Sequence, residues 1–106
     1  MKIGVLCNSK LSIPSIQFLV QSGHQVAMAL PAEKSDDQEE LEHFAMHFQI
    51  LVTRVAKASL QHELLFWNAA NQFDTIFVIT FPYILPKSLI SSIGKPMINF
   101  HFAPLP

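Results

Sequence analysis

Residues 75–80 read TIFVIT, an uninterrupted run of apolar and β-branched side chains. A run of this length without polar alternation is typical of a strand that is covered on both faces in a parallel sheet. This predicted strand decides the fold class, because parallel strands are joined by crossover connections that place helices on the faces of the sheet.

Further strands are predicted on both sides of this run. Upstream, three apolar segments have strand character: residues 2–7 (KIGVLC), 25–30 (QVAMAL) and 49–55 (QILVTRV). Downstream, residues 97–101 (MINFH) are the last predicted strand, which we expect to be buried. The chain therefore contains five strand candidates that are separated by segments of different character.

The segment between the first two strands predicts a helix. Ser12 can cap its beginning, Pro14 is tolerated in a first turn, and Gly23 can take the left-handed position at its end. Apolar residues recur within this segment at helical spacing, which gives the helix one face for packing on a sheet.

Three more segments have helical signals. Residues 39–48 carry an apolar stripe at positions i, i+3, i+4 and i+7, formed by Leu41, Phe44, Ala45 and Phe48. Ser59 can cap a helix over residues 60–73, and a short helical turn is expected at residues 87–93. Strands that alternate with helices predict an α/β fold, a Rossmann-like and mostly parallel sheet with helices on both faces, in a single domain over residues 1–106.

Composition excludes several classes of function. The sequence has 7 Lys and Arg residues against 8 Asp and Glu residues, with no basic cluster, so we expect no direct nucleic-acid binding by this segment. No apolar run approaches the roughly 20 residues that a membrane-spanning helix needs, and no export signal is visible. The single cysteine, Cys7, fits a reducing compartment. We therefore expect a cytoplasmic protein with no membrane association.

Two common site motifs do not occur in this sequence. No glycine lies between Gly4 and Gly23, so the loop after the first strand lacks the dinucleotide fingerprint, and the Walker pattern is absent too. His43 and His47 have the i, i+4 spacing of metal ligands, but they lie off the apolar stripe and without the glutamate of a zinc motif. We expect both histidines to face solvent and predict no metal site.

Asn99 and His101 are two polar side chains in the last predicted strand. Alternation places both on one face, while Ile98 and Phe100 point to the other face. In open parallel sheets, ligands bind beyond the carboxyl ends of the strands, where this pair lies. A carboxamide and an imidazolium could stabilise the oxyanion of an acyl transfer. The pattern alone is equally consistent with a strand end that carries two satisfied polar groups.

Residues 83–106, YILPKSLISSIGKPMINFHFAPLP, resemble the formyltransferase family, which includes methionyl-tRNA, glycinamide ribonucleotide and sugar-amine formyltransferases. The family carries a tyrosine-containing segment that ends in Ile-Leu-Pro, then Asn-x-His at the end of a strand, then a Leu-Leu-Pro turn. The residues that match in order are Tyr83, Ile84, Leu85, Pro86, Asn99, His101, Leu105 and Pro106. Residues 1–30 also look like the first strand, helix and second strand of this family.

The resemblance implies specific roles. Asn99 would polarise the formyl carbonyl, and His101 would stabilise and protonate the tetrahedral intermediate. The formyl donor of the family is 10-formyltetrahydrofolate, whose pteridine lies against the loop that is FPYILP here. Pro82, Tyr83, Ile84 and Leu85 are therefore the expected donor-binding residues. The acceptor amine is not implied by this segment.

The sequence also departs from the family pattern. Ile84 directly follows Tyr83 where relatives carry a glycine, and the turn after His101 reads APLP. The family's catalytic aspartate lies beyond the Asn-x-His strand, so we expect this chain to be the amino-terminal part of a longer polypeptide and to be inactive alone. Two alternatives to formyl transfer follow, namely a non-catalytic folate-binding or interaction module and a 10-formyltetrahydrofolate hydrolase.

Overall fold

The computed structural model describes residues 1–100, and these form a five-stranded sheet with helices on both faces. The strands are β1 Lys2–Cys7, β2 Gln25–Pro31, β3 Leu51–Val55, β4 Thr75–Ile79 and β5 Met97–Phe100. The α-helices are α1 Ile13–Gln21, α2 Gln38–His47, α3 Leu60–Asn71 and α4 Lys87–Ile93. Short 3₁₀ turns, Lys10–Ser12 and Lys57–Ser59, precede α1 and α3.

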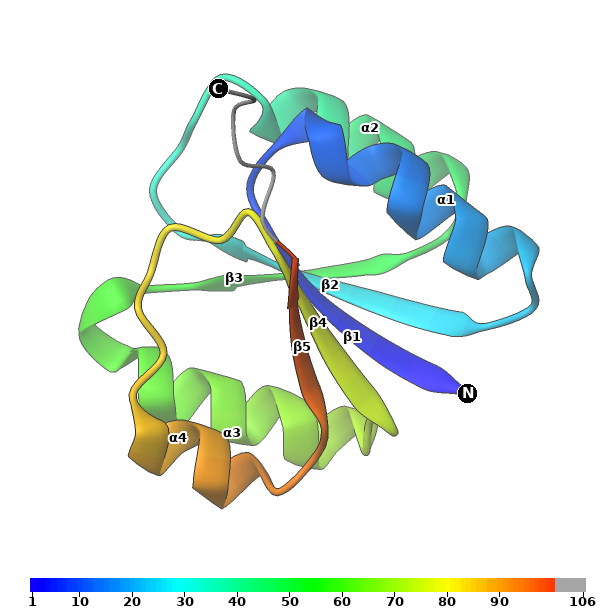
Figure 1. The fold of residues 1–106 in the computed structure, drawn as a ribbon. Coiled ribbons are helices and arrows are strands. Elements are labelled where there is room, and N and C mark those ends of the chain that lie inside the picture. The colour runs from blue at the N-terminus through cyan, green and yellow to red at the C-terminus, as the bar shows by residue number, and fades with distance from the viewer. Residues whose placement is uncertain (101–106) are drawn as a thin grey trace, which may run out of the picture.

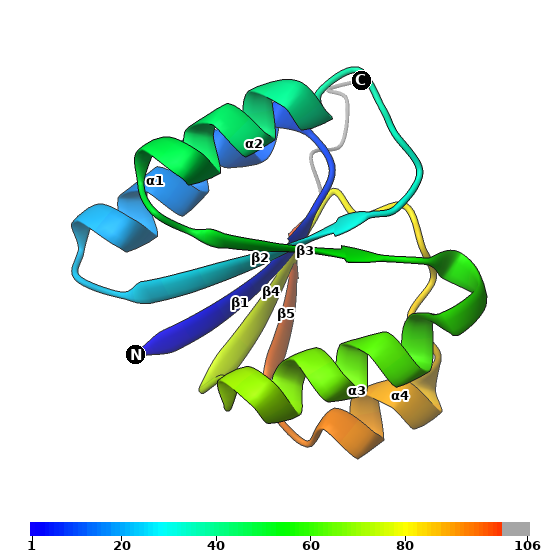
Figure 2. The same ribbon diagram turned by 180° about the vertical axis from the view of Figure 1, so that it is seen from behind.

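All four strand pairings in the described chain are parallel, and the strand order is β3-β2-β1-β4-β5. Helices α1 and α2 cover one face of the sheet, and α3 and α4 cover the other (Figures 1 and 2). The predicted α/β, Rossmann-like architecture with helices on both faces is therefore confirmed.

The core consists of two apolar clusters, one on each face of the sheet. Successive residues of β1 point to opposite faces, so Val5 packs with the α1 and α2 side and Leu6 with the α3 side. Both side chains are fully buried. The continuous apolar character of β1 follows from this double coverage.

Gly4 marks the closest approach of α3 to the sheet. A Cβ atom at this position would lie 2.7 Å from Cη2 of Trp67 and 2.9 Å from Cε2 of Phe73. The two aromatic rings pack against each other with centroids 4.5 Å apart. Glycine at this position therefore leaves the space that the rings fill.

Two predicted strands are shorter in the structure, because residues at their ends adopt left-handed backbone. The predicted strand over residues 49–55 begins only at Leu51, since Gln49 has φ 57° and ends the turn that follows α2. The predicted strand over residues 75–80 ends at Ile79, since Thr80 has φ 54°. Predicted helix 60–73 ends at Asn71 for the same reason, with Gln72 left-handed at φ 54°.

The predicted serine caps are wrong in their contacts. Ser12 and Ser59 occupy the cap positions of α1 and α3, but neither side chain makes a capping hydrogen bond. The buried Ser12 hydroxyl donates to the Ser9 carbonyl at 2.6 Å, and the Ser59 hydroxyl donates to the Glu63 carboxylate. Glu63 also accepts from the Ala56 amide at 3.0 Å, and these two hydrogen bonds lower the pKa of its carboxyl.

Strand β5 was predicted to be buried, but in the structure it is not. It pairs with β4 alone in the part of the chain that the structure describes. Ile98 is 44% exposed and Phe100 is 42% exposed. The prediction was wrong because apolar composition reports the preference of the side chains and not the presence of a neighbour that would cover them.

The strand order creates a switch point between β1 and β4. The chain leaves β1 toward α1 on one face, and it leaves β4 toward α4 on the opposite face (Figure 1). In open α/β sheets such a divergence opens a crevice beyond the carboxyl ends of the strands. The residues that follow β1 and β4 are therefore the first candidates for a ligand site.

Candidate functional site

A cavity of about 690 Å³ lies at the carboxyl ends of β1, β4 and β5. Its walls come from Asn8, directly after β1, from residues 80–85 after β4, and from Met97 and Asn99 of β5. Its volume is within the range of small-molecule sites, and its lining is mostly apolar with a few polar groups, as is usual for such sites.

The loop after β4 forms the largest part of the wall. Phe81, Tyr83 and Leu85 pack against the core cluster on the α3 and α4 face, while Pro82 and Ile84 remain exposed. The rings of Phe81 and Tyr83 meet edge to face, with centroids 5.3 Å apart. This alternation anchors the loop from within and leaves its outer residues and backbone accessible to a ligand.

Two features of this loop point to binding. Thr80 has φ 54°, which is uncommon for a β-branched residue, and strained backbone of this kind clusters at ligand and active sites. The Tyr83 hydroxyl oxygen is buried and has no hydrogen-bond partner among the described residues. A buried hydroxyl without a partner is costly, so a ligand group that hydrogen-bonds it would be favoured.

Asn99 reaches the same cavity from β5. It lies opposite Val78 in the register of β4 and β5, on the same side of the sheet as Met97, and it is exposed. Ile98 and Phe100 lie on the other face, where the Phe100 ring meets Phe77 with centroids 5.3 Å apart. His101 lies outside the described residues, so its pairing with Asn99 stays a prediction.

The structure thus places five of the six predicted site residues around one cavity. These are Pro82, Tyr83, Ile84, Leu85 and Asn99. Leu105 and Pro106, which contribute to the sequence resemblance, lie outside the described residues together with His101. The chemical roles of all six residues remain predictions.

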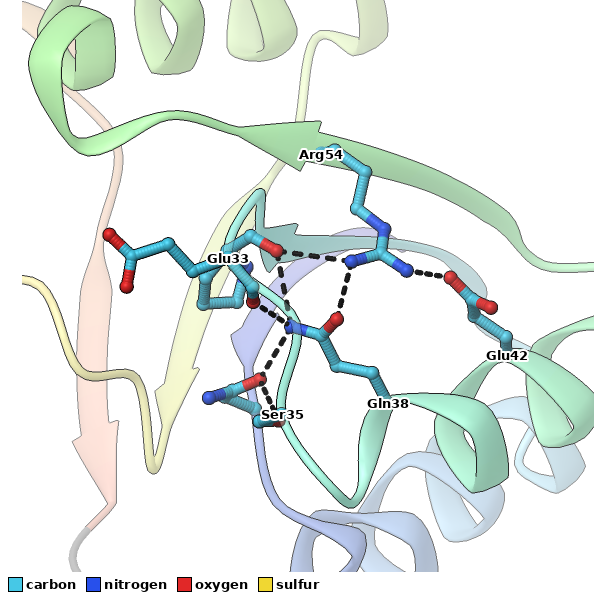
Figure 3. A network of polar contacts seen from close by, with 7 residues as sticks. Glu33, Ser35, Gln38, Glu42 and Arg54 are labelled. Atoms are coloured by element: carbon cyan, nitrogen blue, oxygen red, sulfur yellow. Dashed lines mark hydrogen bonds and ion pairs between the residues drawn. The ribbon is translucent and has the colours of Figure 1, made fainter.

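Sequence reasoning missed Asn8, which lines the cavity and also hydrogen-bonds to a polar network. Figure 3 shows Ser35, Gln38, Arg54 and Glu42 of this network. The Asn8 Oδ1 accepts from Ser35 Oγ at 3.1 Å and from Gln38 Nε2 at 3.0 Å. Gln38 in turn accepts from Arg54, whose second guanidinium nitrogen pairs with Glu42. The position of Asn8 as the first polar residue after the first strand could have identified it, because that position lies at a switch point.

The cavity carries no charged side chain among the described residues that line it. Cys7 lies just before Asn8 but is fully buried, and burial raises the pKa of its thiol to about 12. A hydrogen bond with Ser12 offsets part of this effect. Cys7 is therefore a core residue and not a nucleophile, since nucleophilic cysteines need a lowered pKa and access to solvent.

His43 and His47 are both exposed on α2, as predicted. Within residues 1–100, no three His, Cys, Asp or Glu side chains gather where they could hold a metal ion. No helix in this range is long and apolar enough to cross a membrane.

Comparison with known proteins gives a match in structure but not in sequence. No protein-family model and no curated protein matches the sequence. The fold matches the crystal structure of phosphoribosylglycinamide formyltransferase from Anaplasma phagocytophilum with a TM-score of 0.71 and 20% sequence identity. The match covers 100% of this chain and 52% of that enzyme.

The chain therefore has the fold of about half of a formyltransferase and spans about half of its length. The sheet order and the crossover helices belong to this shared architecture. The resemblance seen in the sequence is matched by the resemblance in fold. At this level of identity the likeness concerns the fold, and activity requires a separate argument.

Proposed function

We propose that this chain is the donor-binding part of a 10-formyltetrahydrofolate-dependent formyltransferase. The proposal rests on one observation. Asn99 and residues 82–85 line the same cavity, in a fold that matches a formyltransferase. These residues are separated in sequence by the whole of α4. Their convergence at the carboxyl end of the sheet is what a site shared by a donor and a catalytic amide requires.

The chemistry of the wall fits a folate. A pteridine is flat, has apolar faces and carries polar atoms along its edge. The apolar side chains of Phe81, Leu85 and Met97 suit such faces, while exposed loop backbone and the unpartnered Tyr83 hydroxyl suit polar edges.

In the proposed reaction, the acceptor amine attacks the formyl carbon of the donor, which forms a carbon–nitrogen bond and a tetrahedral oxyanion. The amide N–H of Asn99 donates a hydrogen bond to that oxygen and stabilises the developing charge. Collapse of the intermediate breaks the bond between the formyl carbon and the donor nitrogen and releases tetrahydrofolate. His101 supplies a proton to the intermediate, and the amine gives up its own proton to a base.

The described residues supply no such base in the cavity, so we propose that a further part of a longer polypeptide provides it. The apolar surface beside β5 supports this proposal. Phe18 of α1 is 68% exposed, and together with Ile98 and Phe100 it leaves apolar side chains uncovered at the open side of the sheet. Such a surface is suited to packing against further secondary structure.

The test is the substitution Asn99→Ala in a polypeptide that includes this chain and is active with 10-formyltetrahydrofolate. Loss of one oxyanion donor is expected to lower kcat by about 10²- to 10³-fold. The control is Met46→Ala, an exposed position on α2 away from the cavity, which should leave kcat within a few-fold of the parent. Activity within a few-fold of the parent for Asn99→Ala would exclude the proposed role.

A second candidate, favoured by the uncharged lining of the cavity, is a folate-binding module without turnover. A hydrolase that uses water in place of the amine would share the same donor site. Incubation with 10-formyltetrahydrofolate, first without an acceptor and then with amine acceptors, separates the three. Rapid release of formate without an acceptor indicates the hydrolase. Binding of the folate with no product, whichever acceptor is added, indicates the binding module. Turnover only in the presence of an amine indicates the transferase.

A further inference from the structure

The polar network that hydrogen-bonds to Asn8 determines which atom of Asn8 faces the ligand site. Arg54 can only donate hydrogen bonds, and its Nη1 lies 2.6 Å from Gln38 Oε1. The carbonyl oxygens of Pro31 and Glu33 can only accept, and they lie 3.1 and 2.7 Å from Gln38 Nε2. Gln38 is 3% exposed, so its carboxamide has one orientation that satisfies these neighbours.

The orientation of Gln38 fixes that of Asn8. Gln38 Nε2 has two N–H groups for three neighbouring acceptors, so it shares them among the Pro31 and Glu33 carbonyls and the Asn8 side chain at 3.0 Å. Because this nitrogen cannot accept a hydrogen bond, the Asn8 oxygen and not its NH2 group faces it. The Ser35 hydroxyl donates to the same oxygen at 3.1 Å. A flipped Asn8 would place two N–H groups against each other, at a cost comparable to a lost hydrogen bond.

The Asn8 amide nitrogen is consequently directed away from the network. The side-chain hydrogen bonds of Asn8 within residues 1–100 involve its oxygen, and Asn8 is half-buried and borders the cavity. Asn8 therefore differs from an ordinary surface asparagine, which can rotate to present either its oxygen or its nitrogen. The group that Asn8 has free to offer a ligand is its amide nitrogen.

Asn8 and Asn99 approach the cavity from strands that flank β4 on either side. With neighbouring strands about 4.8 Å apart, the axes of β1 and β5 lie roughly 10 Å apart. A ligand that uses both carboxamides has hydrogen-bond acceptors at two separate places.

The charge around Asn8 indicates the kind of acceptor. No charged side chain lines the described cavity, and segment 33–40, which supplies Ser35 and Gln38, contains five acidic residues and one lysine. Of the basic residues nearby, Arg54 is engaged by Pro31, Gln38 and Glu42, and Lys10 is exposed and does not line the cavity. A phosphate or carboxylate would lose hydration at this position without gaining a cationic partner. An uncharged carbonyl oxygen meets the donor without that cost.

We propose that Asn8 is a ligand-binding residue whose Nδ2 donates to an uncharged carbonyl oxygen, with Gln38 and Arg54 as the positioning residues that hold it in this state. The inference rests on the proposed function only in taking this cavity as the ligand site. It does not depend on whether the ligand is the formyl donor or the acceptor.

The experiment follows the side-chain amide resonances of Asn8 by NMR, assigned by their loss in Asn8→Asp. N,N-dimethylformamide serves as an uncharged carbonyl probe, inorganic phosphate as an anionic probe, and 5-formyltetrahydrofolate as the folate. We expect the first and third probes to shift these resonances and phosphate to leave them unchanged. Asn8→Asp should weaken binding of 5-formyltetrahydrofolate by about tenfold. Asn71→Asp, which adds the same charge on α3 away from this cavity, should leave the affinity unchanged.

A second variant tests the positioning. In Gln38→Glu the side chain can only accept, so Asn8 should rotate, donate to Glu at position 38 and present its oxygen to the cavity. Affinity should fall about as much as in Asn8→Asp although no cavity residue has changed. Should this variant fail to fold, Asn8→Asp decides alone, because its size is unchanged and its site is only half-buried.

The outcomes separate this inference from the proposed function. Binding of the folate with the same affinity to Asn8→Asp and the parent overturns the inference and leaves the formyltransferase proposal in place. Failure of the folate to bind, with dimethylformamide still shifting the Asn8 amide, overturns the folate site and supports the role of Asn8. A larger shift with phosphate than with dimethylformamide overturns the assignment of an uncharged acceptor.

Discussion

Strands β1 and β5 flank β4 in the same sheet, yet their surroundings differ. β1 has a hydrogen-bonded strand on each edge, and its Val5, Leu6 and Cys7 side chains are fully buried. β5 has one such neighbour among the described residues, and Ile98 and Phe100 remain 44% and 42% exposed. The comparison shows that neighbours decide the burial of an apolar strand. The buried β1 region stabilises the fold, whereas the exposed β5 region is accessible for binding or catalysis.

The largest expected difference concerns thiol reactivity in the two strands. Burial raises the pKa of Cys7 to about 12, so the thiolate fraction at pH 8 in the folded chain is on the order of 10⁻⁴. A cysteine introduced by Ile98→Cys on β5 should titrate near its ordinary pKa of about 8.5. We expect the introduced thiol to react with iodoacetamide more than about 10³-fold faster than Cys7.

The same raised pKa makes a prediction about pH. In the unfolded chain Cys7 ionises near pH 8.5, while in the folded chain it stays protonated, so the unfolded state binds fewer protons above that pH. The free energy of unfolding should therefore fall as the pH rises from about 8.5 toward 12. Cys7→Ala should remove this part of the pH dependence, and a parent and variant with the same slope would contradict the assignment.

Two phenylalanines test the difference in stability. Phe73 is fully buried against Trp67 and Gly4, whereas Phe100 is 42% exposed on β5. Phe73→Ala should lower the free energy of unfolding by about 3–5 kcal/mol. Phe100→Ala should cost less than about 1.5 kcal/mol, because much of that ring already contacts water. Equal losses in urea denaturation would show that β5 is as well packed as β1.

Gly4 tests the close packing around β1. In Gly4→Ala the added methyl group would meet the Trp67 and Phe73 rings at under 3.0 Å, so the rings must shift. We expect a loss of about 1–3 kcal/mol in the free energy of unfolding. Gly23→Ala is the control, since φ is 92° and no atom lies within 4 Å, so its cost is conformational and should be about 1 kcal/mol.

Thr80 tests the boundary between the two regions, where β4 ends and the cavity begins. Its φ of 54° is unfavourable for a β-branched residue, so Thr80→Gly should raise the free energy of unfolding by about 1 kcal/mol. Thr53→Gly, within β3, should lower it by a similar amount. Loss of ligand affinity in Thr80→Gly would show that the Thr80 side chain serves the site, because glycine keeps the left-handed backbone.

Much of the candidate site could be predicted from sequence. Asn99 was predicted from its place at a strand end, and residues 82–85 were predicted from the resemblance to the formyltransferase family. The structure places both on one cavity, because the carboxyl ends of parallel strands share one edge of the sheet. The position of Asn8 after the first strand could have marked it as a candidate, but its fixed orientation could not be predicted from sequence. Its importance comes from Ser35, Gln38 and Arg54, which are distant in sequence.

The sequence by itself determined the type and order of the elements. Continuous apolar runs such as residues 75–80 predict strands, and the i, i+3, i+4 stripe of residues 39–48 predicts a helix, because these periods follow from local backbone geometry. Alternation of the two types then determined the parallel sheet with helices on both faces.

Only the tertiary structure decided the strand order, the exposure of β5, the left-handed backbone at Thr80 and the fixed orientation of Asn8. Each of these depends on contacts between segments far apart in the chain. The intrinsic propensity of a residue favours a type of secondary structure. Its burial and hydrogen bonds depend on which segments the folded chain places beside it.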